Sequence, residues 1–150
     1  MDKELESRGL RFVRYADDFD IFVKSERSAD RVMASVSHWL ESKLRLKVSA
    51  TKTKVVRPTK SVFLGFTFWK STRGWECRPT DVAKEKLETK VKQILLRKRA
   101  SAQPMSYIFT RLNQIIRGWV NYYHIGSMAT YLRDVFGPWM RHKVRVVIVK

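Results

Sequence analysis

The segment RFVRYADDFDIFVK, residues 11–24, places two short apolar runs on either side of adjacent carboxylates at Asp17 and Asp18. Aromatic and β-branched residues dominate both runs, which predicts two strands of a hairpin with its acidic residues, "ADD", at the turn. Turn chemistry alone is one explanation of the acidic pair, because Asp tolerates turn conformations well. The other explanation is a divalent-cation site, since two hard carboxylates on a rigid turn suit Mg²⁺.

The rest of the chain is strongly basic, which makes this acidic point unusual. The 150 residues carry 31 Lys and Arg against 14 Asp and Glu, a formal net charge of +17. Between residues 42 and 75 there are nine basic residues and no acidic one. Repulsion on this scale favours a polyanion, so we expect nucleic acid. A membrane-surface protein would more usually carry a single basic amphipathic helix, so no membrane partner is expected.

The composition is that of a globular protein, with 44% hydrophobic residues and 12% aromatic residues. No apolar run reaches the roughly 20 residues that a membrane-spanning helix needs, and the charged N-terminus lacks the apolar centre of a signal peptide. The single cysteine, Cys77, cannot form an internal disulfide. We therefore expect a reduced, cytoplasmic protein.

The first part of the chain, residues 1–78, predicts a mixed α/β arrangement. A helix over residues 25–44, capped by Ser25 or Ser28, should follow the hairpin. Short strands are expected over residues 46–49 and 52–58, and two longer ones over 61–70 and 74–79 are joined by the turn STRG.

The second part, residues 79–150, predicts three packed helices, so the fold class is α+β. The helices are expected over residues 80–99, 104–123 and 127–150, because apolar residues recur there at helical spacing. Thr80 is the expected cap of the first helix. Gly137-Pro138 should kink or break the third helix. The tail VRVVIVK, residues 144–150, is β-branched and fits a strand equally well, so its course stays open.

Four motifs in this order resemble those of group II intron-encoded reverse transcriptase/maturase proteins. RFVRYADDFDIFVKS is similar to their catalytic hairpin, with the Tyr-Ala-Asp-Asp box at residues 15–18. LKVSATKTKV, residues 46–55, resembles the next part of the palm, although Ser49 stands where the family often has Asn. FLGFTF, residues 63–68, resembles the strand pair that grips the primer end, and LNQIIRGWVNYY, residues 112–123, resembles the maturase or thumb domain. The resemblance implies a partial palm over residues 1–78 and a thumb or maturase domain over 79–150.

The resemblance implies a catalytic role for the hairpin. Asp17 and Asp18 correspond to the catalytic aspartates that bind metal, so the cofactor of the complete enzyme would be Mg²⁺. Tyr15 and Ala16 correspond to residues beside the nucleotide and the primer end, and Lys52 corresponds to the palm lysine near the incoming triphosphate. Asp20 occupies a variable position of the family and is not taken as a ligand.

Nucleic-acid contacts are implied further along the chain. The primer-gripping residues correspond to Phe63, Leu64, Gly65 and Phe66. The RNA-facing candidates of the thumb are Arg111, Arg117, Asn121 and Arg133. Ordinary packing also explains the aromatic residues in both segments, because the phenylalanines alternate as in a sheet core and three rings recur at helical spacing, namely Trp119, Tyr122 and Tyr123.

The function implied is that of an RNA-directed DNA polymerase and intron maturase of a mobile element, a nucleotidyltransferase whose partners are intron RNA, an RNA template and a DNA primer. The family's third aspartate and its fingers lie upstream of the box, whereas 16 residues precede Asp17 here. A fragment that is inactive alone is therefore expected. The alternative is a non-catalytic, maturase-type RNA-binding module that assists intron splicing. A dimer through an exposed sheet edge at residues 10–15 is compatible with either function.

Overall fold

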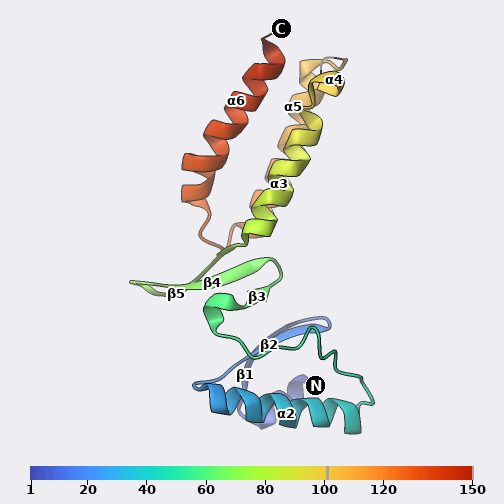
Figure 1. Cartoon of the computed structure of the whole chain (residues 1–150), viewed down its shortest axis with the longest axis vertical. Helices are drawn as coiled ribbons and strands as arrows, with labels where there is room; N and C mark the ends of the chain where they lie inside the picture. The colour runs from blue at the N-terminus through green and yellow to red at the C-terminus, as the bar shows by residue number, and fades with distance from the viewer. Residues whose placement is uncertain (101, 150) are drawn as a thin grey trace. The chain divides into compact units, whose positions relative to one another are not determined.

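The computed structural model describes residues 1–100 and 102–149, apart from the side chains of Arg97 and Arg99. These residues form two compact units, Met1–Arg57 and Pro58–Lys150 (Figure 1). The chain changes from mixed to helical after residue 79, as expected, whereas the compact units divide at residue 57. The domain boundary drawn from the sequence at residue 78 stays a prediction.

The first unit packs a hairpin against a long helix. Its elements are α1 (Asp2–Ser7), β1 (Arg11–Tyr15), β2 (Asp18–Phe22) and α2 (Glu26–Lys43). The N-cap of α2 is Ser25, whose hydroxyl accepts a hydrogen bond from the Ser28 amide at 3.3 Å. The core consists of buried residues from both helices, with three hairpin side chains packed on them: Leu5, Val36 and Leu40, then Phe12, Phe19 and Ile21.

The segment after α2 contains no strand, so the two strands expected over residues 46–49 and 52–58 are wrong. The backbone turns locally here instead. Arg45 has a left-handed φ of 54°, and the amides of Lys52 and Thr53 donate to the Ser49 carbonyl at 3.2 and 2.9 Å. A β-branched run becomes a strand only where a partner strand pairs with it, and these backbone groups are used within the segment.

The second unit begins with an antiparallel sheet of strands β3 (Val62–Phe63), β4 (Phe66–Ser71) and β5 (Gly74–Pro79), in the order β3-β4-β5. A short 3-10 turn, η1 (Pro58–Lys60), precedes it. The single strand expected over residues 61–70 is in fact two strands, because the chain reverses at Leu64 and Gly65. Both turn residues have positive φ, 51° and 79°, as a two-residue type I′ hairpin requires.

The helices of this unit are α3 (Asp81–Ile94), α4 (Arg97–Ala100), α5 (Met105–Tyr123), a π-helix η2 (Tyr131–Phe136) and α6 (Gly137–Ile148). Figure 1 shows α3, α5 and α6 running alongside one another. Thr80 caps α3 as expected, its hydroxyl accepting from the Ala83 amide at 3.2 Å. The predicted apolar stripes form the core, whose buried members include Leu87, Val91, Leu95, Ile108, Leu112 and Phe136.

The third helical stretch changes its winding at Gly137-Pro138. A Cβ on Gly137 would lie 2.8 Å from the Leu132 carbonyl oxygen, so glycine lets the π-helix close tightly on itself. Pro138 then lies in the first turn of α6, where the missing N–H has no helical partner to lose. The tail is helical as far as Ile148, which decides the choice that the sequence left open. Among the helices described, none combines the length and the apolar composition that spanning a membrane requires.

Candidate functional site

The hairpin of the first unit separates a packed face from an exposed, acidic face. Tyr15 pairs with Asp18 and Val13 pairs with Asp20, so these four side chains share one face. The opposite face carries the aromatic and aliphatic residues that pack on α1 and α2. Asp18 begins β2, so the turn itself has two residues, Ala16 and Asp17, one fewer than the sequence indicated. Asp17 and Asp18 are exposed at the tip, and Asp20 is half-buried.

The backbone at the tip is strained, and Arg14 supports it. Ala16 has a left-handed φ of 55°, a conformation that costs a non-glycine residue roughly 1–3 kcal/mol. Arg14 Nη1 donates to the Ala16 carbonyl at 2.8 Å. The same guanidinium meets both carboxylate oxygens of Asp2, through Nη2 at 2.8 Å and Nε at 2.7 Å. The hydrogen bond and the charge of Asp2 raise the pKa of Arg14, so the tie between α1 and the turn is charged throughout the physiological range.

Sequence reasoning missed Arg14. The signal for it was present, because alternation puts Arg14 on the face that packs against the core, where a cation needs a partner. Asp2 supplies that partner from α1. The consequence is that the turn that presents the aspartates is fastened to a second element rather than held by its own strands alone.

The donor set at the tip fits a hard cation. Within residues 1–100 and 102–149, no three or more His, Cys, Asp or Glu side chains are grouped so as to hold a metal. Asp17 and Asp18 are two adjacent exposed carboxylates, and Mg²⁺ commonly binds through one or two carboxylates, water and substrate phosphates. The hairpin can therefore contribute part of a coordination shell that a phosphate substrate would complete.

Lys52 lies in the exposed turn that follows α2. Its amide is used in that turn, by donating to the Ser49 carbonyl at 3.2 Å. Its ammonium group belongs to the exposed part of the side chain, where a phosphate could reach it. The role implied for Lys52 beside a triphosphate stays a prediction.

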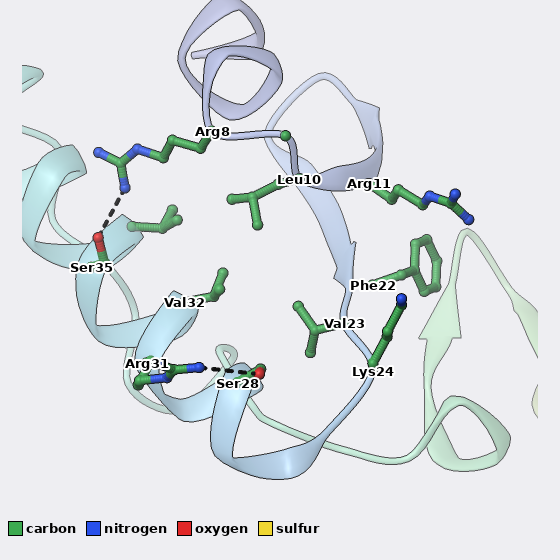
Figure 2. Close-up of a pocket in the computed structure, with 12 residues that line it drawn as sticks. Arg8, Leu10, Arg11, Phe22, Val23, Lys24, Ser28, Arg31, Val32 and Ser35 are labelled. Carbon is green, nitrogen blue, oxygen red and sulfur yellow. Dashed lines mark hydrogen bonds between the residues drawn. The ribbon is translucent and has the colours of Figure 1, made fainter.

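A basic hollow of about 840 Å³ lies between the open end of the hairpin and α2 (Figure 2). Apolar side chains such as Leu10 and Val32 form part of its lining, and its cationic members are Arg8, Arg11, Lys24 and Arg31. Two of these cations are engaged within the fold. Arg8 donates to the Ser35 hydroxyl at 2.9 Å, and Arg31 donates to the Ser28 hydroxyl at 3.4 Å. The hollow adds positive charge to the unit that carries the acidic turn.

In the second unit, the turn of β3 and β4 meets the C-terminal end of α5. The Tyr122 hydroxyl donates to the Leu64 carbonyl at 3.1 Å, and the Thr80 amide donates to the Gly65 carbonyl at 2.9 Å. Phe66 is 8% exposed and lies against the ring of Tyr123, with 5.0 Å between centroids. The predicted primer-gripping segment is thereby brought together with aromatic residues of the predicted thumb.

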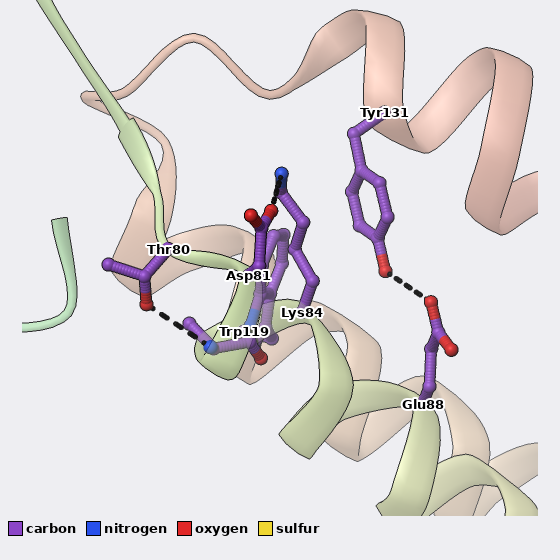
Figure 3. A network of polar contacts seen from close by, with 7 residues as sticks. Thr80, Asp81, Lys84, Glu88, Trp119 and Tyr131 are labelled. Atoms are coloured by element: carbon purple, nitrogen blue, oxygen red, sulfur yellow. Dashed lines mark hydrogen bonds and ion pairs between the residues drawn. The ribbon is translucent and has the colours of Figure 1, made fainter. Parts of the chain in front are cut away.

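A polar network fastens α3 to α5 and to the π-helix (Figure 3). Trp119 Nε1 donates to the Ala83 carbonyl at 3.2 Å, and the Tyr131 hydroxyl donates to Glu88 at 3.2 Å. Lys84 pairs with Asp81 at 2.8 Å and lies 5.3 Å from the centre of the Tyr131 ring. The hydrogen bond from Lys84 lowers the pKa of Asp81, whereas burial raises the pKa of Tyr131 far above its usual range. Lys84 therefore serves packing, despite its charge.

The RNA-contact candidates fall into two groups. Arg117 and Asn121 are exposed on α5, and their four-residue spacing places them one above the other. Arg111 is exposed on the same helix and donates to Gln114 at 3.0 Å. Arg133 lies instead in the π-helix, where its guanidinium is within 2.7 Å of Asp134. The exposed ridge of α5 thus carries the candidates with no acidic neighbour in these contacts, whereas the charge of Arg133 is opposed.

Comparison with known protein families matches most of the chain in two parts. Residues 1–68 match the reverse transcriptase (RNA-dependent DNA polymerase) family, and residues 84–150 match the group II intron, maturase-specific domain. A comparison with curated proteins finds no match. Reverse transcriptases generally use Mg²⁺, and both families bind RNA, so RNA is a partner consistent with the charge of the chain.

Proposed function

We propose, on the premise that the chain belongs to the reverse transcriptase/maturase proteins of group II introns, that its hairpin supplies two Mg²⁺ ligands for RNA-directed DNA synthesis. Asp17 is the principal ligand, and Asp18 is the second. The observation that carries the proposal is the strained turn at Ala16, which Arg14 supports from the packed side. Strain that the surrounding structure maintains is characteristic of functional turns.

The residues around the tip have complementary tasks in this proposal. Bound Mg²⁺ would neutralise phosphate charge and favour in-line attack of the primer 3′-hydroxyl on the nucleotide. Tyr15 is 66% exposed on the same face as Asp18, so its ring is available to a nucleobase or to the primer end. Lys52 offers a cation to the triphosphate, and the Phe63–Phe66 segment faces the primer.

The second unit is proposed to bind the intron RNA and the template–primer duplex. Residues 79–150 hold 14 basic and four acidic residues, a net charge of +10. Contacts with phosphates release counterions, so affinity of this kind depends steeply on salt. The ridge of Arg117 and Asn121, with Arg111 nearby on α5, is the proposed contact surface, and Arg133 is a weaker contributor.

The test uses Mn²⁺ as a paramagnetic substitute for Mg²⁺. In the presence of an RNA template, a DNA primer and a nucleotide, Mn²⁺ should broaden the NMR signals of residues 15–20. Asp17→Asn should remove most of this broadening and leave RNA affinity nearly unchanged, because one hairpin carboxylate contributes little to a phosphate-binding surface. Asp30→Asn, which changes an exposed carboxylate on α2, is the matched control. Broadening that survives in Asp17→Asn would show that Asp17 is not a ligand.

A non-catalytic maturase-type module is the second candidate function, and the maturase-specific match over residues 84–150 favours it. The double variant Asp17→Asn/Asp18→Asn separates the two. Full splicing assistance by a wild-type chain that shows no Mn²⁺ effect at the hairpin would support the RNA-binding module alone.

A further inference from the structure

The turn between β3 and β4 adopts a backbone that its sequence does not favour. Type I′ hairpins need positive φ at both central residues, and Asn-Gly or Gly-Gly usually provide it. Here the first central residue is Leu64, with a φ of 51°. A leucine gains nothing locally from a left-handed backbone, so contacts from elsewhere must stabilise the turn.

Both turn carbonyls are bound from outside the hairpin. The Leu64 carbonyl accepts from the Tyr122 hydroxyl at 3.1 Å, across 58 positions of sequence. The Gly65 carbonyl accepts from the Thr80 amide at 2.9 Å, next to the start of α3. The two bonds orient both peptide groups of the turn, and one of them comes from the last turn of α5.

The Tyr123 ring closes the other side of the turn. A Cβ built on Gly65 would lie 2.5 Å from the Tyr123 hydroxyl oxygen, although the ring carbon that bears it would be 3.5 Å away. The ring has little room to move aside, because Phe66, Trp119 and Tyr122 pack around it with centroid distances of 5.0, 4.7 and 4.7 Å. Burial, followed by the neighbouring Tyr122, raises the pKa of Tyr123, so its hydroxyl stays neutral.

We propose that Tyr122 and Tyr123 are positioning residues, which hold the Leu64–Gly65 turn in the conformation that meets the primer end. The maturase-matched helix α5 would then set the geometry of the primer-facing turn as well as contact RNA. The inference rests on the proposed function, because the primer is the ligand assigned to this turn. It goes further by giving two tyrosines of α5 a part in primer placement.

Packing alone does not account for the pair. Tyr122 is 53% exposed, so most of its ring contributes little to the core, yet its hydroxyl reaches the strained residue of the turn. Tyr107 provides a matched comparison, since it lies on the same helix and is also 53% exposed. Tyr107→Phe should therefore leave the turn unaffected, whereas Tyr122→Phe removes the hydrogen bond to Leu64.

The first measurement is amide hydrogen exchange in the free 150-residue chain. The Thr80 amide reports directly on the turn, because it donates to Gly65. Tyr122→Phe should speed its exchange by about fivefold, the effect of losing one typical hydrogen bond. Gly65→Ala should speed it as well, and adding Tyr123→Phe should recover part of the loss, because the nearest remaining ring carbon is at an ordinary contact distance. The strain at the positive φ of residue 65 would remain.

The second measurement uses an RNA template–DNA primer duplex with 4-thiothymidine at the primer 3′ end. The wild-type chain should cross-link through residues 62–66. The yield should fall in Tyr122→Phe and Tyr123→Phe while duplex affinity is retained, and it should be unchanged in Tyr107→Phe. A simple loss of stability would lower affinity and yield together.

The outcomes separate the two layers of the proposal. If the wild-type chain gives no cross-link at residues 62–66, the primer assignment fails, and this inference fails with it. If the wild-type chain cross-links there and the tyrosine variants do so equally, the primer assignment stands and the positioning role is wrong. Equal exchange effects of Gly65→Ala with and without Tyr123→Phe would also refute the role of Tyr123.

Discussion

Replacing Phe66 tests whether the primer-facing segment is anchored through its aromatic core. Phe66 is 8% exposed and has two aromatic neighbours on α5, Tyr123 at 5.0 Å and Tyr122 at 6.1 Å between centroids. A Cβ on Gly126 would lie 3.1 Å from its ring, so the ring also fills the space beside that backbone. We chose Phe66→Leu, because leucine keeps most of the apolar surface and removes the ring.

The expected cost follows from these contacts. Truncation of a buried Phe to Ala typically costs about 3–5 kcal/mol, most of it from lost burial and the cavity. Leucine retains much of that burial and loses mainly the aromatic pairing, which is worth roughly 0.5–1.5 kcal/mol per pair. The pair with the half-exposed Tyr122 counts for less than the pair with Tyr123. Phe66→Leu should therefore destabilise the unit by about 1–2 kcal/mol.

Urea unfolding followed by tryptophan fluorescence is the appropriate assay, because four of the five tryptophans lie beyond residue 57. Phe109→Leu is the control, since Phe109 is 43% exposed on α5 and its replacement should cost less than about 0.5 kcal/mol. If Phe66→Leu were as mild as Phe109→Leu, the ring of Phe66 would not be part of the core, and the reasoning about the anchored turn would be refuted.

Three further predictions concern the charges. Arg117→Ala should reduce the log–log salt slope of RNA binding by about 0.7–0.9, the effect of one phosphate contact, and Arg133→Ala should reduce it less; filter binding at rising KCl measures both, and equal slopes in all variants would contradict the α5 surface. Burial raises the pKa of Tyr131, so the folded state keeps a proton that the unfolded state loses, and stability should fall as the pH rises above about 10. Thermal melts should show a smaller alkaline loss in Tyr131→Phe, and an unchanged loss would mean that Tyr131 is not responsible. Arg14→Gln should weaken Mn²⁺ broadening at the hairpin, because the turn that presents Asp17 loses its support; NMR titration would disprove this if the broadening persisted.

Local patterns were sufficient for most of the regular elements. Alternating residues 11–22 specify the hairpin, and Ser25 and Thr80 mark helix starts because their hydroxyls bond amides only three residues away. The apolar stripes of α3 and α5 specify which faces are buried, because a helical period of 3.6 residues places such positions on one side. The acidic pair, its exposure at the hairpin tip and the basic character of both parts are likewise readable from the order of residues.

Local patterns failed where the outcome depended on a distant partner. Residues 46–49 and 52–58 have strand-like composition but bond within their own segment, and residues 144–148 are β-branched but helical. Both cases have one cause, since β propensity is expressed through pairing and packing with neighbours that the local sequence does not contain.

The sequence by itself determined the family, the helices, the hairpin and the residues available for chemistry, because each depends on motifs or on spacing along the chain. The tertiary structure alone decided how the two strained turns are held. Asp2 reaches Arg14 across 12 positions and Tyr122 reaches Leu64 across 58, so neither contact leaves a local periodic signal. Folding brings these groups together, and their hydrogen bonds stabilise backbone conformations that Ala16 and Leu64 would not adopt alone.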